Sequence, residues 1–416
     1  MTLIYDVIVI GGGAAGMMAA ITAGAQGAKV LLLERNPKVG RKIYITGKGR
    51  CNVTNHCDTK VFLENLCCNA KFLHSGISQF PPEATEEFFT SRGVPLKVER
   101  GNRVFPESDK ATDIIDCLLR ELRKSKVFIR EDRALEVEKD DLFTVFGEES
   151  KYQGKKLILA TGGVSYPKTG STGDGYHFAE SLGHSIVPLY PSLIPLEIKE
   201  SFCKDLQGLS LKNVGFKVKN SKKKTIFSQQ GELLFTHFGI SGPLVLSAST
   251  HMRAWDQEHY TCYIDFKPAL TEEQLDERLL RELTEHANRD ILNILPNLLP
   301  RLMVPVMANY VQIAHHRKGH EVRKAERLRL LEALKSFRLT VEQPRPLEEA
   351  VVTAGGVSVK EVNPKTMESK KVEGLFLAGE LLDLDAYTGG FNLQIAWSTG
   401  FLAGKSASER EDIKND

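Results

Sequence analysis

Apolar residues near the start of the chain occur in two short runs that flank a stretch of small residues. Residues 5–10 (YDVIVI) are mostly apolar and β-rich with glycines directly after them, and residues 28–33 form a second apolar run that ends at Glu34. Between them, residues 14–25 are mostly small helix formers. A short apolar run bounded by turn residues is typical of a buried parallel strand. The pattern therefore predicts a strand–helix–strand unit.

Two later regions extend this pattern. Residues 133–153 alternate between apolar and polar positions, which predicts a small antiparallel meander, and residues 155–163 form another apolar run stopped by glycines. Near the C-terminus, residues 375–378 read as a strand, followed by an acidic turn and an apolar helix that opens at a glycine pair. Together these elements predict an α/β fold with a Rossmann-like domain.

The middle of the chain has a different pattern of apolar and polar residues. Residues 193–267 contain short alternating runs, which predict a small antiparallel barrel or sheet. From Thr271 the pattern turns helical, with an N-cap threonine and acids in the first turn, and three or four helices follow. The expected domains are 1–190 and 346–416 for the two parts of the Rossmann-like domain, 191–270 for an inserted β domain and 271–345 for an inserted helical domain.

Composition narrows the class of protein. A chain of 416 residues is too long for one ordinary core. Its net charge of +2 gives no reason to expect a nucleic acid or an anionic membrane as the main partner. The first apolar run is far shorter than a membrane span, and seven cysteines in a large chain without a secretion signal favour reduced thiols in the cytoplasm. No cluster with metal-ligand spacing stands out, so no metal is expected.

The first motif that indicates a ligand is GGGAAG, which directly follows the first predicted strand. Gly11, Gly13 and Gly16 match G-x-G-x-x-G, where the glycines allow a tight turn, close approach of a pyrophosphate and close helix packing. The helix N-terminus offers N–H groups and a positive dipole end to the phosphates. Glu34 follows at the distance where a carboxylate accepts hydrogen bonds from a ribose and repels a 2′-phosphate. The sequence therefore predicts a site for FAD or NAD rather than NADP.

A family resemblance rests on these residues and on several longer motifs. They include GRKIYITGKGRCNVTN, FPPEATEEFF, RVFPES, ATGGVSYPKTGSTGDGY, LLFTHFGISGP, VVTAGGVSVKE and the late AGE…D…TGG…N. The chain resembles proteins of the glutathione-reductase-type FAD fold. Within that fold it is similar, from end to end, to a bacterial family of NAD(P)/FAD-dependent oxidoreductases with aminoacetone-oxidase-like and bile-acid dehydro-reductase-like members. These motifs identify family and cofactor but not substrate.

The resemblance implies noncovalent FAD and an extended set of contacts. On the ADP half it places Gly11, Gly13, Ala14, Ala15, Gly16, Glu34 and Arg35. Near the ribityl chain and ring it places Arg41, Gly47, Gly49, Arg50, Cys51 and Asn52, with Thr161 and Gly162 at the ATGG turn. By the pyrophosphate and ribitol it places Gly379, Glu380 and Asp383, and by the isoalloxazine Gly389, Gly390, Phe391, Asn392 and Leu393. A helix that begins at Gly390 would stabilise the negative charge of a reduced flavin.

The stretch GKGRCNVTN, residues 47–55, admits three interpretations. As a phosphate loop it lacks the Ser or Thr that should follow the lysine. As a redox dithiol, Cys51 and Cys57 have five intervening residues instead of four, and no C-terminal His–Glu pair is present to move protons. The remaining interpretation is a glycine-rich strap, residues 47–55, whose backbone approaches the flavin. Arg50 and Asn52 would then supply hydrogen bonds, and Cys51 would lie near the ring.

Two residues are candidates for catalysis. His237 lies in a glycine-rich loop of the insertion and would orient a substrate or transfer a proton, or else bond only within its own turn. Tyr166 follows the ATGG strand, at the strand end where ligands gather in such sheets, and would contact substrate or pack on the inserted domain.

The sequence thus predicts an FAD-dependent oxidoreductase that transfers hydride to a small organic substrate. No second G-x-G-x-x-G is present, so NAD(P)H would act as a transient electron donor at the flavin. One alternative is a flavin oxidase of a small amine. Another is an RNA-associated or nonenzymatic FAD-binding protein that uses the basic insertion helices, against which the near-neutral charge argues. The oligomeric state stays open.

Overall fold

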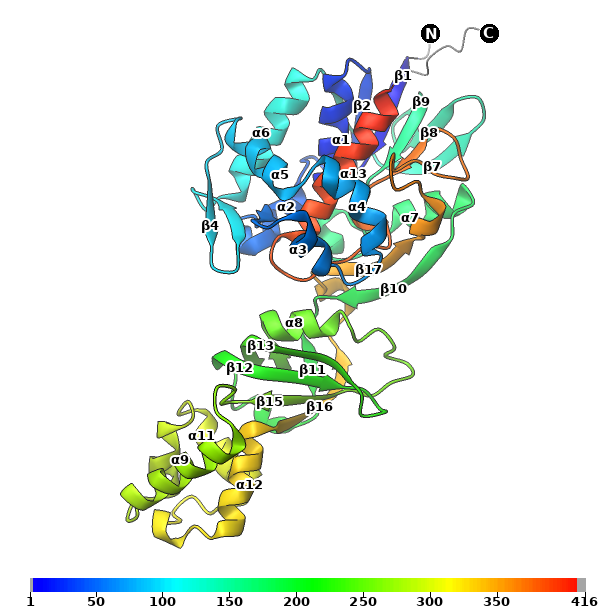
Figure 1. Cartoon of the computed structure of the whole chain (residues 1–416). Coiled ribbons are helices and arrows are strands. Elements are labelled where there is room, and N and C mark those ends of the chain that lie inside the picture. Colours follow the sequence, from blue (N-terminus) through cyan, green and yellow to red (C-terminus); the bar gives the residue numbers. More distant parts are fainter. Residues whose placement is uncertain (1–2, 410–416) are drawn as a thin grey trace. The chain divides into compact units, whose positions relative to one another are not determined.

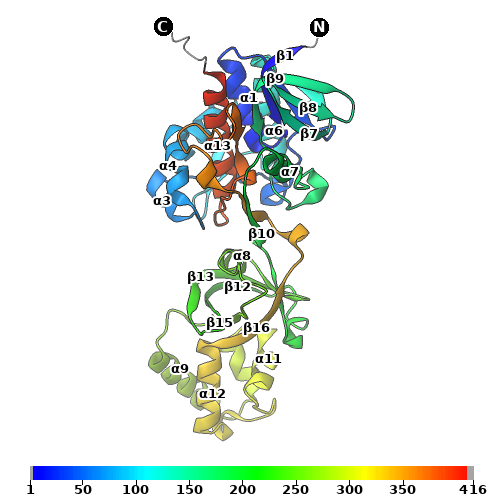
Figure 2. The ribbon, with the colours of Figure 1, turned by 90° about the vertical axis from the view of Figure 1, so that its right-hand side faces the viewer.

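The computed structural model describes residues 3–409, and these form two compact units (Figures 1 and 2). The first unit comprises the described residues up to Ser192 and from Leu347 onward. The second unit is Leu193–Pro346. The chain therefore leaves the first unit once, builds the second, and returns to complete the first.

A seven-stranded sheet forms the centre of the first unit. Its order is β6-β2-β1-β9-β8-β7, and β18 pairs with the end of β9. The strands are β1 (Ile4–Ile10), β2 (Val30–Glu34), β6 (Phe128–Glu131), β7 (Ala134–Lys139), β8 (Phe143–Gly147), β9 (Lys151–Leu159) and β18 (Leu375–Leu377). Strands β6, β2, β1, β9 and β18 are parallel, whereas β7 and β8 form the antiparallel meander. The predicted Rossmann-like fold with a meander is confirmed.

Two helices beside this sheet pack against each other with their backbones in close contact. They are α1 (Ala14–Ala25) and α13 (Phe391–Ser408), which lie side by side in Figure 1 although they come from opposite ends of the chain. A Cβ added at Gly400 or Gly404 would collide with the carbonyl oxygen of Ala15 or Ala19. Small residues at these four positions therefore let the final helix pack directly on the first one.

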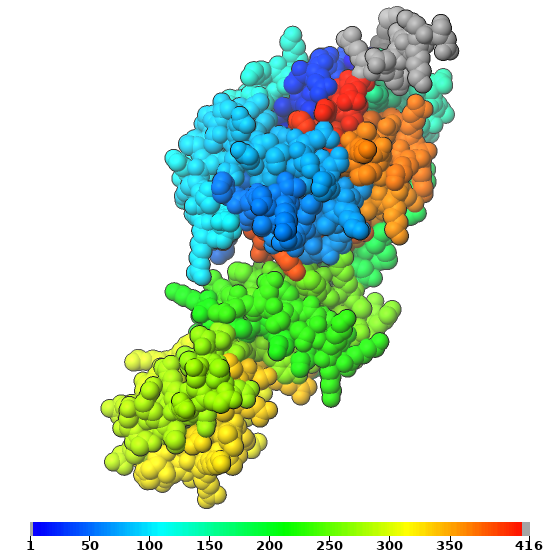
Figure 3. Space-filling view, viewed as in Figure 1, coloured from blue at the N-terminus to red at the C-terminus, as the bar shows by residue number. Residues whose placement is uncertain are grey.

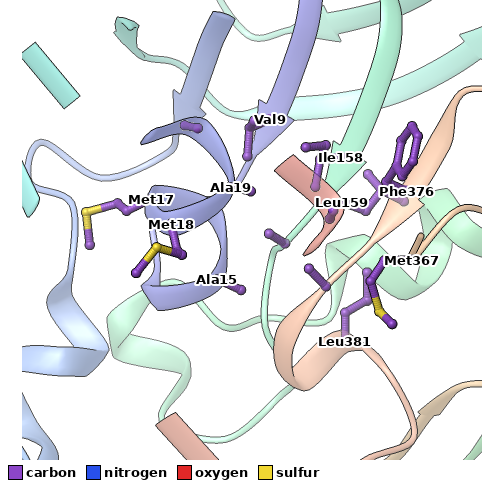
Figure 4. Packing of buried hydrophobic residues seen from close by; sticks show 14 of the residues in the cluster. Val9, Ala15, Met17, Met18, Ala19, Ile158, Leu159, Met367, Phe376 and Leu381 are labelled. Atoms are coloured by element: carbon purple, nitrogen blue, oxygen red, sulfur yellow. The ribbon is translucent and has the colours of Figure 1, made fainter. Parts of the chain in front are cut away.

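Apolar side chains from strands and helices fill the core between these layers. Val9, Ala15, Met17, Ile158 and Phe376 are all at most 6% exposed, and Figure 4 shows them on α1, β1, β9 and β18. The runs that the sequence marked as buried strands therefore have apolar contacts on both faces, as parallel strands require.

The remaining elements of the first unit lie around the sheet. The helices are α2 (Arg41–Ile45), α3 (Thr59–Glu64), α4 (Ala70–Gln79), α5 (Pro82–Thr90), α6 (Ala111–Lys124) and α7 (Asp174–Ser181). The strands β3 (Thr54–Asn55), β5 (Arg103–Pro106) and β4 (Leu96–Glu99) form a small sheet, and β10 (Ile186–Ser192) pairs with β17 (Val352–Val357). Residues 59–90, drawn blue to cyan in Figure 3, form a continuous surface on this unit.

The second unit contains a closed barrel. Its order is β11-β14-β13-β12-β15-β16. The strands are β11 (Leu196–Ile198), β12 (Ser210–Lys219), β13 (Thr225–Thr236), β14 (Gly239–Ser241), β15 (Thr261–Asp265) and β16 (Phe337–Pro344), with α8 (Pro243–Ser249) beside them. The sequence interpretation assigned residues 337–344 to the helical domain. They instead close the barrel between β15 and β11, because the run FRLTVE alternates in burial as a strand does.

Helices occupy the chain between β15 and β16. They are α9 (Glu272–Glu285), α10 (Ile291–Ile294), α11 (Met303–Tyr310) and α12 (Lys324–Lys335). The predicted cap at Thr271 is confirmed: its hydroxyl accepts the N–H of Gln274 at 3.2 Å, and the Gln274 side chain accepts the N–H of Thr271 at 3.0 Å. Within residues 3–409, none of the helices combines the length and the apolar character needed to cross a bilayer.

Candidate functional site: a dinucleotide site at the strand ends

The turn between β1 and α1 has the shape that a dinucleotide requires. Gly11 has φ +107°, and a Cβ there would collide with the carbonyl oxygen of Ala160, while a Cβ on Gly16 would collide with that of Gly11. A Cβ on Gly13 would instead meet no atom within 4 Å. The protein's own packing thus explains Gly11 and Gly16 but not Gly13. Open space at Gly13, in front of the α1 N-terminus, fits a pyrophosphate.

The carboxylate of Glu34 is fixed at the end of β2. Its Oε2 accepts the N–H of Gly12 at 2.7 Å, and its Oε1 accepts the backbone and side-chain N–H groups of Asn36 at 2.9 and 2.6 Å. Arg41 in turn donates to the Asn36 side chain at 2.6 Å. A carboxylate held beside the glycine turn is the acceptor that a ribose diol needs. Arg35 pairs with Asp174 at 2.9 Å, next to this group.

The strap joins the N-terminus of α13. With its amide oriented so that both ends are bonded, Asn52 accepts the N–H of Gly390 at 2.9 Å. The Asn55 side chain donates to the carbonyl of Gly389 at 3.0 Å. Gly390 has φ +101°, and a Cβ there would collide with the carbonyl of Thr54. The glycine pair is therefore required by the close approach of the strap, and α13 begins directly beside it.

The N-terminus of α13 holds the predicted flavin-ring residues together. Phe391, Asn392 and Leu393 form its first turn, whose N–H groups have no carbonyl partner within the helix. Asn392 closes the preceding loop, because its side chain accepts the N–H of Ala386 at 3.0 Å and donates to the carbonyl of the same residue at 2.8 Å. Such a helix start favours negative charge in front of it.

A partly buried ionic cluster lies at the end of β18. Gly379 has φ +75° and follows Ala378, and Glu380 accepts from Lys42 Nζ at 2.5 Å, from the Ser165 hydroxyl at 2.8 Å and from the Thr353 N–H at 2.9 Å. Burial raises the pKa of Glu380, but the Lys42 charge and these hydrogen bonds outweigh burial and lower the pKa below its usual value.

Other predicted contact residues have protein partners of their own. Arg50 pairs with Glu99 and Asp109 and stacks 4.1 Å from the centre of the Phe105 ring, so it holds the strap to the β4–β5 hairpin. Asp383 accepts from the Asn69 side chain at 2.9 Å. Three remaining positions lie on turns of the same unit: Gly47 (φ +57°) and Gly49 (φ +84°) in the strap, and Gly162 (φ +77°) after β9. Thr161, beside Gly162, has a buried hydroxyl without a hydrogen-bond partner in the structure.

The two cysteines of the dithiol interpretation are both thiols here. Cys51 is fully buried with φ +62°, and burial raises its pKa to about 12 despite a hydrogen bond to Thr46. Burial, together with Asp58 and Glu86, raises the pKa of Cys57 to about 11. Thiolate is the reactive form of cysteine, so both environments oppose disulfide chemistry at neutral pH.

The two catalytic candidates lie in different units. Tyr166 is half-buried after β9 in the first unit, with φ +52°, and burial and Glu349 raise its pKa. His237 is exposed in the second unit on the turn between β13 and β14, edge-on to the Phe238 ring at 5.0 Å between ring centres. A catalytic role for either residue stays a prediction.

Sequence reasoning missed several residues of this region. Asn55, Gln394, Ser165, Thr353 and Lys42 make hydrogen bonds that join the strap, the β9 loop, β17, β18 and α13. Asn55 lies within the quoted motif and was the detectable one. The others have no local signal, because each has at least one partner more than a hundred residues away.

The glycine turn, the acid after β2 and the helix α13, which follows Gly390, together define an FAD-binding α/β oxidoreductase. The comparisons with known proteins agree. The model of the HI0933-like protein Rossmann domain matches residues 5–406, so the chain belongs to this family of flavoproteins. The predicted family, fold and cofactor FAD are thereby confirmed, as is an oxidoreductase activity.

Relatives and solved structures match nearly the whole chain. The 3-dehydro-bile acid delta(4,6)-reductase of Clostridium scindens is 33% identical over 97% of this chain and 98% of its own. The ribosomal RNA dihydrouridine synthase of Escherichia coli is 32% identical over 95% of this chain and 96% of its own. The 3-ketosteroid delta1-dehydrogenase of Sterolibacterium denitrificans shares the fold, with a TM-score of 0.51 and 13% identity over 98% of this chain and 100% of its own. A flavocytochrome c3 fumarate reductase matches with a TM-score of 0.51 and 16% identity, over 97% of this chain and 78% of that one.

Proposed function

We propose that this protein is a reductase that uses noncovalently bound FAD and NAD(P)H to saturate a carbon–carbon double bond conjugated with a carbonyl group. The observation that carries this proposal is the end-to-end similarity to two relatives at 33% and 32% identity. Their names describe different molecules but one reaction class. A delta(4,6) double-bond system beside a 3-oxo group and the ring double bond of uridine are both alkenes activated by a carbonyl.

The site supports hydride chemistry of this kind. When bound, FAD supplies a ring that accepts hydride from a donor and delivers it to an electron-poor carbon. The chain contributes the N-terminus of α13, where backbone N–H groups of Phe391, Asn392 and Leu393 favour negative charge. It also contributes the strap, which Asn52 and Asn55 fasten to Gly390 and Gly389. These groups hold and stabilise the reduced form that the reaction needs.

Three features of the sequence and structure support a transient nicotinamide donor, a cytoplasmic location and noncovalent binding of FAD. The chain contains a single G-x-G-x-x-G motif, so the nicotinamide would visit the flavin without a Rossmann domain of its own. Cys51 is fully buried and Cys57 is a thiol, which fits a reducing compartment such as the cytoplasm and a noncovalent cofactor.

Precipitation of the FAD-loaded protein with trichloroacetic acid tests noncovalent binding. All of the flavin should appear in the supernatant, and flavin retained in the pellet would contradict noncovalent binding.

Anaerobic mixing of the FAD-loaded protein with NADH or NADPH tests the proposal. The visible flavin band should bleach, and a steroid with a 4-en-3-one group should then restore it with loss of one double bond. If neither nucleotide bleaches the flavin, while a small amine does so and oxygen restores it, the protein is an amine oxidase and the reductase proposal fails.

A second candidate is a reductase of uridine within RNA, and one feature of the second unit favours it. Residues 315–329 carry six Lys or Arg against two Glu. Arg317 and Arg327 are paired, with Glu326 at 2.9 Å and Asp276 at 2.8 Å, but Arg323 and Lys324 are exposed at the start of α12. Ribosomal RNA that binds with steep salt dependence and gains dihydrouridine would select this candidate. A nonenzymatic FAD-binding protein would give neither bleaching nor product.

A further inference from the structure

Lys42 was not among the predicted FAD contacts, yet it forms a partly buried ion pair with Glu380, which was. Its ammonium donates to Glu380 at 2.5 Å and to the Ser165 hydroxyl at 2.6 Å. The Lys42 and Glu380 side chains are 23% and 18% exposed. These contacts bring together α2, the loop after β9 and the end of β18, which are far apart in sequence.

This cluster lies beside the dinucleotide turn. Lys42 lies on α2, and the residue before this helix, Gly40, donates its N–H to the carbonyl of Gly12 at 2.9 Å. Gly379, directly before Glu380, packs so closely on α1 that an added Cβ would lie 2.8 Å from the Ala15 side chain. The Lys42–Glu380 pair is therefore tied on both sides to the segment that receives FAD.

Counting donors and acceptors shows what the pair is able to bind. The ammonium of Lys42 has three hydrogens, and Glu380 and Ser165 take two of them. Glu380 Oε1 accepts hydrogen bonds from Ser165 and Thr353. Among residues 3–409 its Oε2 accepts a hydrogen bond only from Lys42, so Oε2 has room for a further donor. The two charges cancel, which disfavours a phosphate. A hydroxyl group both donates and accepts a hydrogen bond. It therefore fits the third hydrogen of the Lys42 ammonium beside the available Oε2 of Glu380.

We propose that Lys42 is a cofactor-positioning residue, which holds Glu380 so that its carboxylate accepts a hydrogen bond from a hydroxyl of FAD. Lys42 acts through Glu380, because its ammonium group forms an ion pair with that carboxylate and not with the cofactor. Without the ammonium, Glu380 would be a buried carboxylate with neutral partners only, and burial would favour its protonated form. The inference rests on the FAD site and is independent of the substrate.

The test is a double-mutant cycle on FAD affinity. Apoproteins of wild type, Lys42→Met, Glu380→Gln and the double variant are titrated with FAD, and quenching of FAD fluorescence gives Kd. Each single variant should bind FAD about 10- to 100-fold more weakly, and the double variant should be no weaker than Glu380→Gln. Lys38→Met is the matched control, because Lys38 is an exposed lysine four residues earlier, and its Kd should equal that of wild type.

The pH profile separates positioning from a general loss of structure. Between pH 5.5 and 8.5, the FAD affinity of wild type and of Glu380→Gln should stay constant. That of Lys42→Met should weaken as the pH falls, because its Glu380 takes up a proton in this range. Lys42→Arg keeps the charge and should restore a flat profile.

Three outcomes would overturn the inference. They are an unchanged Kd in Lys42→Met, losses that add in the double variant, and a flat pH profile in Lys42→Met. If Lys42→Met fails to fold, Ser165→Ala removes a hydrogen bond to the same carboxylate and keeps the charge, and its Kd must then rise. FAD binding without bleaching by NAD(P)H would defeat the reductase proposal and leave this inference standing.

Discussion

The hydroxyl of Thr54 donates to the side-chain oxygen of Gln394 at 2.6 Å, and both side chains are completely buried. The two residues are 340 positions apart in the chain. Gln394 also donates to the carbonyl of Phe80 and to the Ser398 hydroxyl, each at 3.0 Å. The strap, α4 and α13 are thus joined by one buried amide.

Removing the hydroxyl should weaken the fold measurably. Thr54→Val keeps the side-chain shape but leaves the Gln394 oxygen buried without a donor. We expect the free energy of unfolding to fall by about 1–3 kcal/mol, measured by urea denaturation of the apoprotein. Thr225→Val, at an exposed position of β13, should change it by less than about 0.5 kcal/mol. Equal effects of both variants would contradict the role of this bond.

Two glycines of the dinucleotide turn should differ in what they support. Gly13→Ala adds a methyl group into open space, so we expect normal stability of the apoprotein and FAD affinity at least about tenfold weaker. Gly16→Ala forces a methyl group against the Gly11 carbonyl and should lower stability by several kcal/mol or prevent folding. Thermal unfolding and FAD titration of both variants check this pair. Tight FAD binding by Gly13→Ala would place the pyrophosphate elsewhere.

A buried histidine between α7 and β10 predicts a pH dependence of stability. The His184 side chain is 0% exposed, with Nε2 2.8 Å from the Ser369 hydroxyl and Nδ1 3.2 Å from Glu361. Burial lowers the pKa of His184, with Lys371 adding to this effect and Glu361 opposing it. The unfolded chain binds the proton near pH 6.5 whereas the folded chain does not, so stability should fall as the pH drops below about 6.5.

The slope should reach at most about 1.4 kcal/mol per pH unit for this one group. His184→Gln should flatten the profile between pH 6.5 and 5, while His177→Gln, at an exposed position, should leave it unchanged. The pKa of Glu361 is lowered to about 2, so its own contribution is lost only below about pH 4.5 and stays outside this window. A profile that His184→Gln leaves unaltered would show that another group is responsible.

Cysteine substitutions should spare the redox activity. Cys57→Ser removes a thiol whose pKa is about 11, so we expect the rate of flavin reduction to change by less than about twofold. Two-electron reduction should give no long-wavelength charge-transfer band in either protein. A band in wild type that disappears in Cys57→Ser would restore the dithiol interpretation.

Periodicity was sufficient for β1, β2 and the end of β9 because these segments are largely buried, whereas the exposed strand β6 was not predicted. Runs such as residues 5–10 and 155–159 carry that information locally, and the glycine turn follows directly. The barrel was predicted as a set of short strands, but its last strand was missed. Residues 337–344 come after four helices, and only tertiary pairing with β11 and β15 makes them part of the barrel.

The residues of the candidate site also fall into two groups, those predicted from local sequence and those that only the fold brings together. Gly11, Gly13, Gly16 and Glu34 are recognisable because one turn and the two strands beside it position all of them. Lys42, Ser165 and Glu380 meet only when α2, the β9 loop and β18 are assembled, and nothing in the spacing of these residues indicates it. Arg50 was expected to bond the flavin, and the folded chain supplies it with Glu99, Asp109 and Phe105.

By itself the sequence determined the strand–helix–strand unit and the dinucleotide class of cofactor, because both depend on short-range patterns of glycine, acid and apolar residues. The family followed from the resemblance of several longer motifs along the chain. Only the tertiary structure decided what the strap does. Its glycines and asparagines lie where Gly389 and Gly390 must approach, and a hydrogen bond between segments more than 300 residues apart has no counterpart in local spacing. Side-chain partners of this kind are set by packing, which the linear pattern does not encode.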